Sequence, residues 1–313
     1  MLEVRLAWSG RGMDLFGLFS KTYETLKSNL LLFLPPLINI YLIPVALGIA
    51  AAYIFIPIFV VATGTGQLLS GMIAGGLLGL LILGILALVM YSAVFAGWGN
   101  MNRFALTRRK TYFGDFKAGF RKYFGRVVAA AVITVVVLLV LALAGLATII
   151  SIGLPVLRRI MERISGQGLT GPIAGEPLET LARVIRLAAS SGGVVLVFLT
   201  LAGLWLLFTL FWIPAIVVSD LGLFSALSRS FSFVKRNFYT VIGYAGLYII
   251  AERFTRTIFP GGGGGGGGGG VGAGYGFGFG IAPALEGVFQ VLIQAFFILL
   301  LYAIYVDRTR GRR

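Results

Sequence analysis

Three polar side chains stand at four-residue intervals in an otherwise apolar stretch near the end of the chain. They are Glu286, Gln290 and Gln294, in the sequence ALEGVFQVLIQAFF. Residues four apart lie on one face of an α-helix, so the three form a single polar stripe. Ionisable residues within membrane spans are rare and mark functional sites by default, which makes this stripe the first candidate for a substrate or ion path.

A second group of charges precedes it in IAERFTRTIF, where Glu252, Arg253 and Arg256 stand near the end of another apolar stretch. The two stretches are consecutive, and as antiparallel helices they would place these charges at the depth of Glu286. We therefore expect Glu286 to pair with Arg253 or Arg256, which would serve a substrate path or a purely structural role. The alternative is that Glu286 extends to the headgroups while the glutamines bond to neighbouring helices.

The residues that most enzymes use are missing from this chain. It contains no cysteine and no histidine in 313 residues, which excludes disulfides, thiolate nucleophiles, Cys/His metal sites and imidazole acid–base chemistry. A lone carboxylate without a second acidic partner at catalytic spacing offers little. We predict that the protein is not an enzyme and uses no cofactor or metal.

Composition indicates an integral membrane protein. Hydrophobic residues make up 58% of the chain and charged residues 12%, with a mean hydropathy of +0.96, which no ordinary soluble domain approaches. The formal charge of +15 would suggest nucleic acid in a soluble protein. In a membrane protein it predicts contact with anionic headgroups on the cytoplasmic side, and we expect no nucleic-acid partner.

Six uncharged stretches are long enough to cross a bilayer, because a hydrocarbon core of about 30 Å needs about 20 helical residues. The sequence therefore predicts an all-α, polytopic membrane protein with six transmembrane helices. Pro35 and Pro36 lie at the entry to the first span, and Pro44 and Pro57 are candidate kinks within it. The spans run roughly over residues 30–62, 68–98, 127–154, 192–218, 238–258 and 281–305.

The distribution of basic residues orients these spans. With the N-terminus inside, 19 of the 26 Lys and Arg residues, including all six lysines, fall on the cytoplasmic side. Lys and Arg accumulate on that side of membrane proteins. We predict a multi-pass protein of the cell membrane with both termini in the cytoplasm.

Ten consecutive glycines, residues 261–270, lie in the predicted outer loop 260–280 between spans five and six. A phosphate-binding loop needs a preceding strand, a helix that opens directly after it and a Lys or acidic residue at a set distance, and these are missing. The run is typical of a flexible linker. The alternative is an ordered aromatic cap formed by Tyr275, Phe277 and Phe279.

A short amphipathic pattern recurs along the chain. LFGLFSKTYETLKSNL at residues 15–30 matches LFSALSRSFSFVKRNF at 223–238, and DFKAGFRKYFGRVV at 115–128 fits more loosely. Each copy precedes a pair of predicted spans, which favours a threefold repeat of one amphipathic helix and one helical hairpin. Within a single membrane domain, 1–313, the repeat units are 1–107 (spans 1–2), 108–219 (spans 3–4) and 220–313 (spans 5–6).

Each copy is predicted to be a helix in the cytoplasmic interface. In the first, Phe16, Phe19, Tyr23 and Leu26 recur at helical spacing, with polar and basic residues on the other side. Such a helix places its rings at the acyl boundary and its cations at the headgroups. The acidic residues expected to cap these helices are Asp14, Asp115 and Asp220.

LFWIPAIVVSDLGLFSALSRSFSFVKRNFYTVIGY at residues 210–244, with LLYAIYVDRTRGR at the end, resembles the glycerophosphoryl diester phosphodiesterase membrane-domain-like family. The resemblance covers most of the chain and implies six membrane helices and no established activity. The phosphodiesterase catalytic domain is missing from this chain, so hydrolysis does not carry over.

Two kinds of function remain. One is a transporter-like or lipid-handling role that uses the polar stripe. The other is a membrane scaffold or assembly protein that recruits a protein partner, or a second copy of itself, through its basic cytoplasmic face. A hydrated cavity that reaches Gln294 would favour the first, and a dry bundle the second.

Overall fold

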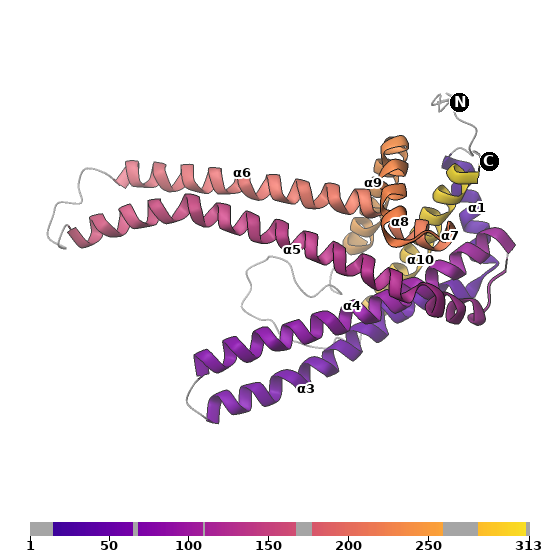
Figure 1. Ribbon diagram of the computed structural model, residues 1–313, viewed down its shortest axis with the longest axis horizontal. Coiled ribbons are helices and arrows are strands. Elements are labelled where there is room, and N and C mark those ends of the chain that lie inside the picture. Colours follow the sequence, from indigo (N-terminus) through magenta and orange to yellow (C-terminus); the bar gives the residue numbers. More distant parts are fainter. Residues whose placement is uncertain (1–14, 65–67, 109, 167–176, 259–280, 311–313) are drawn as a thin grey trace. The chain divides into compact units, whose positions relative to one another are not determined.

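A computed structural model of the chain describes residues 15–64, 68–108, 110–166, 177–258 and 281–310 (Figure 1). Within those ranges every regular element is helical. The elements are α1 (Leu15–Lys27), the 3₁₀ turn η1 (Leu30–Phe33), α2 (Leu34–Leu37), the π-helical turn η2 (Ile38–Leu42), α3 (Ile43–Gly64), α4 (Leu68–Arg108), α5 (Phe113–Gly166), α6 (Pro177–Thr209), α7 (Trp212–Val218), α8 (Leu223–Arg236), α9 (Phe238–Ile258) and α10 (Ile281–Arg310).

Five helical stretches in the described part are long and apolar enough to cross a membrane, which indicates a multi-pass membrane protein. The sixth expected span forms a helix, α9, but it is not among the five. Three charged residues in its last two turns lower its hydropathy, so six spans stay a prediction. The five are Leu30–Val61, Gly75–Arg108, Phe113–Ser151, Gly192–Val218 and Leu285–Thr309.

The chain divides into two compact units. The first combines Met1–Ala131 with Phe211–Arg313, and the second is Val132–Leu210. In the second unit the later part of α5 runs beside α6 (Figure 1), and Phe198 of α6 lies against Gly145 of α5. The predicted repeat boundaries stay a prediction.

Helix α10 is the central helix of the first unit. In its most apolar stretch 56% of the residues are buried, against 6% and 17% in the most apolar stretches of the candidate spans Leu30–Val61 and Gly75–Arg108. Phe296 of α10 packs against Phe19 of α1 at a ring separation of 5.4 Å. The Tyr244 hydroxyl of α9 donates to the Phe297 carbonyl at 3.0 Å.

Aromatic residues close the core around the C-terminal half of α10. Tyr305 packs against Phe233 of α8 with ring centroids 5.2 Å apart, and its hydroxyl lies 2.9 Å from the Ser219 hydroxyl after α7. The Tyr302 hydroxyl lies against Gly99 of α4. The buried core of this unit therefore gathers where α4, α7, α8 and α10 meet.

Helices α3 and α4 run antiparallel and in close contact (Figure 1). A Cβ at Gly75 would meet Ile58, and one at Gly79 would meet Ile54, so glycines of α4 receive side chains of α3. Small residues allow such close approach between membrane helices. The outward Leu, Ile and Val side chains of this pair are exposed, as expected for a surface that faces lipid.

Prolines shape the turn that precedes α3. Pro35 and Pro36 occupy the first turn of α2, where a missing N–H costs nothing. Pro44 cannot donate to the Ile40 carbonyl four residues back, and the Ile43 amide donates to Ile38 five residues back. The result is the π-helical turn η2. The sequence predicted a kink at Pro44 but not its π-helical form.

The three copies of the amphipathic pattern bury equivalent positions. Leu18, Thr22 and Leu26 of α1 are buried, and Phe16 is 86% exposed. The face buried against the protein is therefore distinct from the aromatic stripe, of which Phe16 and Tyr23 are exposed. Placement of these rings at the acyl boundary stays a prediction. The equivalent buried residues are Gly119, Tyr123 and Val127 in α5 and Ala226, Ser230 and Val234 in α8.

Candidate functional site

The predicted polar stripe of α10 packs against the π-helical turn η2. The Gln290 amide donates to the Glu286 carboxylate at 3.2 Å, and the Asn39 amide donates to the Gln294 side-chain oxygen at 3.2 Å. The Tyr41 hydroxyl lies against Gly287. We call Asn39, Tyr41, Glu286, Gln290 and Gln294 the polar seam.

Burial makes the polar seam unusual for an apolar helix. Glu286 is only 5% exposed, and it lies inside the candidate span Leu285–Thr309. The Asn39 side-chain oxygen is also buried, and within the described residues it has no hydrogen-bond partner. Buried polar groups usually have partners, so this oxygen can accept one further bond.

The expected arginine partners of Glu286 are only partly described. The Arg253 side chain is exposed and that of Glu252 is half-buried, whereas the Arg256 side chain lies outside the described residues. The pairing of Glu286 with either arginine stays a prediction. The contacts that the structure describes for Glu286 join it to Gln290 instead.

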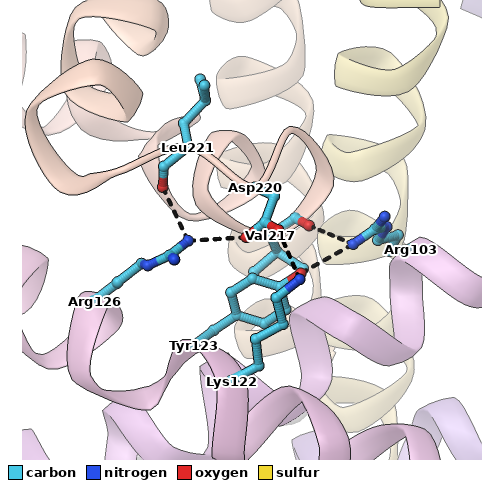
Figure 2. Close-up of polar contacts among 7 residues, drawn as sticks. All are labelled: Arg103, Lys122, Tyr123, Arg126, Val217, Asp220 and Leu221. Atoms are coloured by element: carbon cyan, nitrogen blue, oxygen red, sulfur yellow. Dashed lines mark hydrogen bonds and ion pairs between the residues drawn. The ribbon is translucent and has the colours of Figure 1, made fainter.

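A second polar group, which sequence reasoning did not single out, joins α4 and α5 to the turn after α7 (Figure 2). The Lys122 ammonium lies 2.7 Å from one carboxylate oxygen of Asp220, and the Arg126 guanidinium lies 2.9 Å from the other. Arg126 also donates to the Leu221 carbonyl at 3.4 Å. We call Arg103, Lys122, Arg126 and Asp220 the basic cluster.

Arg103 joins the same region through neutral acceptors (Figure 2). Its guanidinium donates to the Tyr123 hydroxyl at 2.9 Å and to the Val217 carbonyl at 3.1 Å. Val217 is in the last turn of α7, where carbonyls lack helical partners. Arg103 therefore caps the C-terminus of α7, and its positive charge is not neutralised by these contacts.

The backbone at Asp220 explains how its carboxylate reaches two cations. Asp220 has φ of 53°, the left-handed conformation that Asp and Asn tolerate better than most residues. This conformation ends α7 and turns the chain towards α8. The hydrogen bond from Lys122 lowers the pKa of the Asp220 carboxyl below its ordinary value; partial burial opposes that shift, and the hydrogen bond from Arg126 adds to it.

These contacts correct the predicted capping roles. Gly222, not Asp220, is the N-cap residue of α8, and it offers no side chain for capping. Asp115 does not precede α5 but lies in its first turn, where its carboxylate accepts from the Tyr112 amide at 2.9 Å and the Thr111 hydroxyl at 3.3 Å. Asp14 lies outside the described residues. The sequence signal that could have revealed the cluster is the four-residue spacing of Lys122 and Arg126.

Within the described ranges no three His, Cys, Asp or Glu side chains come together as a metal site would require. The predicted absence of a cofactor stays a prediction. The polar seam and the basic cluster both present hydrogen-bonding and charged groups that can bind a polar or anionic group.

Comparison with known proteins gives one result. A family model described as a domain of unknown function (DUF7847) matches residues 13–261. No curated protein and no solved structure matches the chain. The match does not specifically support the resemblance to the glycerophosphoryl diester phosphodiesterase membrane-domain-like family, which stays a prediction.

Proposed function

This chain belongs to the DUF7847 family, whose function is unknown, and on that premise we propose that it is a non-enzymatic membrane protein that handles lipids or small solutes at the polar seam. The observation that carries the proposal is Glu286, a carboxylate that is 5% exposed in an apolar helix. Burying a charge in an apolar environment is costly unless partners compensate it. A residue kept at such a cost in a membrane span is a functional candidate.

The surroundings of Glu286 support binding rather than packing alone. The seam places amide and carboxylate groups in two hydrogen-bonded pairs along α10, with Gln290 on Glu286 and Asn39 on Gln294. The turn that supplies Asn39 is π-helical, a form that is frequent at functional sites. A polar ligand or an ion that moves along these side chains would keep a hydrogen-bond partner at each position.

We also propose the finer architecture: six spans arranged as three hairpins, each preceded by an amphipathic helix, with both termini in the cytoplasm. The equivalent burial of Thr22, Tyr123 and Ser230 supports three related units. Asn29 and Asn237, at equivalent positions, each donate to a carbonyl four residues back, at 2.8 Å and 2.9 Å. Equivalent burial and bonding at a fixed offset are the features expected of repeats.

Single-cysteine labelling tests whether the polar seam is hydrated. The chain contains no cysteine, so each introduced thiol is the sole target of a charged, membrane-impermeant methanethiosulfonate. We expect the Gln290→Cys and Gln294→Cys variants in lipid nanodiscs to react, because a thiol reacts as its thiolate, which needs a polar environment.

Leu292→Cys is the matched control. Leu292 lies on the same helix between the two glutamines and is 42% exposed on an apolar surface. A lipid-facing thiol stays protonated and out of reach, so this variant should remain unlabelled. Equal failure of all three variants would show a dry seam and refute the proposal.

The second candidate is a scaffold or assembly protein that recruits a protein partner or a second copy of the chain. The observation that favours it is the exposure of Lys117 and Arg121 on α5 and of Lys235 and Arg236 on α8, all in the first unit. A dry seam, together with a stable oligomer or captured complex that charge reversal at these positions dissolves, would support this function instead.

A further inference from the structure

Lys122 and Arg126 bind the Asp220 carboxylate from one helix, and we call this pair of cations the pincer. They stand one turn apart on α5, and their donor atoms reach the two oxygens of one carboxylate at 2.7 and 2.9 Å. The pincer is open to the outside, since their side chains are 51% and 40% exposed. An Arg and a Lys that converge on two oxygens match a phosphate as well as a carboxylate.

The pincer lies in the N-terminal part of the candidate span Phe113–Ser151, directly before the uncharged stretch of that helix. The uncharged apolar stretch of this helix begins at Val127, directly after Arg126. Phe120 and Phe124 flank Lys122 on the same helix, with ring centroids 5.0 Å apart. Aromatic rings and basic residues next to an apolar span are typical of the headgroup region.

Charge within the basic cluster is not balanced. The cluster holds three cations, Arg103, Lys122 and Arg126, and one carboxylate. The hydrogen bonds of Arg103 go to a neutral hydroxyl and a neutral carbonyl. Two positive charges are therefore left over within the cluster. A phosphate, which carries up to two negative charges, fits this excess better than a single carboxylate does.

We propose that the basic cluster binds the phosphate of an anionic lipid headgroup, and that Asp220 occupies the pincer when no lipid is bound. The inference goes beyond the polar seam and does not depend on its hydration. A soluble phosphate ester carries the same chemical group. The headgroup is the favoured source because the pincer lies where an apolar span begins.

Asp220 suits the role of a resident competitor. Its side chain is 42% exposed, and it stands in a turn between α7 and α8 rather than within a helix. Its carboxylate can therefore leave the pincer without unwinding either element. Asp220→Asn keeps a residue that tolerates the left-handed conformation and removes the competing charge.

Native mass spectrometry of the full chain in detergent measures retained lipid directly. The probe is phosphatidic acid, with phosphatidylcholine as the zwitterionic reference and glycerol 3-phosphate as the soluble competitor. Lys122→Gln with Arg126→Gln should weaken retention of phosphatidic acid roughly 25-fold, about fivefold for each cation. Asp220→Asn should strengthen it.

The matched control is Lys117→Gln with Arg121→Gln, which removes the same charge from exposed positions of the same helix. We expect it to change retention by less than about twofold, because these two cations are not the ones that converge on Asp220 and exposed charges are screened. Equal losses in both double variants would mean diffuse attraction and overturn the proposal. Weaker retention of phosphatidic acid by Asp220→Asn would refute the claim that Asp220 competes with the lipid. Displacement of the lipid by glycerol 3-phosphate at equal concentration would refute the claim that the bound phosphate belongs to a lipid headgroup.

Discussion

Gly119 lies where α5 crosses α4, and a single added methyl group tests how tightly the two helices meet. A Cβ at this position would lie 2.8 Å from the Ala96 carbonyl oxygen, 3.2 Å from Asn100 Cγ and in contact with Asn100 Cβ. The Ala96 oxygen is backbone and cannot rotate away. The crossing also holds the hydrogen bond from the Asn100 amide to the Asp115 carbonyl, at 2.7 Å.

The expected effect of Gly119→Ala follows from three contributions. Replacing Gly by Ala in a helix interior stabilises the helix by about 1 kcal/mol. Overpacking a tight contact costs about 1 to 3 kcal/mol, and loss of the Asn100 bond costs about 1 kcal/mol more. The net result is a loss of roughly 1 to 3 kcal/mol in the free energy of unfolding.

Thermal unfolding in detergent measures the difference, and Gly125→Ala is the matched control. Gly125 is on the same helix, and a Cβ there would meet nothing within 4 Å. We expect Gly125→Ala to melt at or above the parent temperature and Gly119→Ala to melt clearly below it. If the two variants melt together, the close crossing is not a feature of the folded protein and the reasoning fails.

Three further predictions concern charge and topology. The hydrogen bond from Lys122 lowers the pKa of Asp220 below its ordinary value. The stability that this carboxylate contributes is therefore present above its unfolded-state pKa and is lost as the pH falls through its folded-state pKa. Melting temperatures of Asp220→Asn should change less on acidification than those of the parent. A tag inserted within residues 261–270 should be accessible from outside the cell, and a tag after the last residue should be accessible from the cytoplasm. Accessibility of both tags from the same side would exclude the six-span topology. Glu286→Arg should cost about 1 to 3 kcal/mol and be partly rescued by Arg256→Glu, whereas parent-like melting would show that Glu286 extends to the headgroups.

Helix positions were predictable from the sequence because apolar stretches and prolines mark them. The start of α6 at Pro177 agrees with the preference of proline for the first helical turn. The stripe Glu286, Gln290 and Gln294 lies on α10 as expected. Its contact with Asn39 was not predictable, because the π-helical turn that presents Asn39 depends on how the chain packs around Pro44.

The side of each helix that faces the protein was harder to predict than the place of the helix in the sequence. In a membrane protein both the side that faces lipid and the side that faces protein are apolar, so periodicity cannot separate them. Thr22 and Ser230 are fully buried in α1 and α8, whereas Phe16 and Phe224 are 86% and 74% exposed. Small polar side chains fit close helix contacts, and the large rings remain at the outside.

The four-residue spacing of Lys122 and Arg126 indicates two cations on one face of a helix, but local patterns do not identify the carboxylate that they bind. Asp220 and Lys122 are 98 residues apart in the chain, and each had a plausible local role as a cap or as part of a charged loop. Asp220 has a left-handed backbone conformation, and its carboxylate contacts Lys122 and Arg126 of α5. Contacts of this kind depend on backbone geometry that short sequence windows do not encode.

The central position of α10 has a consequence for biosynthesis. Its packing partners α1, α4, α7, α8 and α9 all precede it in the chain. The ribosome therefore produces the helix that completes their core only after all of them. Until then the face of α4 that carries Gly99 has no Tyr302 to cover it, and Ser219 has no Tyr305. During translation the surfaces that α10 covers therefore stay exposed until α10 is made. We expect a chain truncated before α10 to expose the same surfaces to the translocation and quality-control machinery.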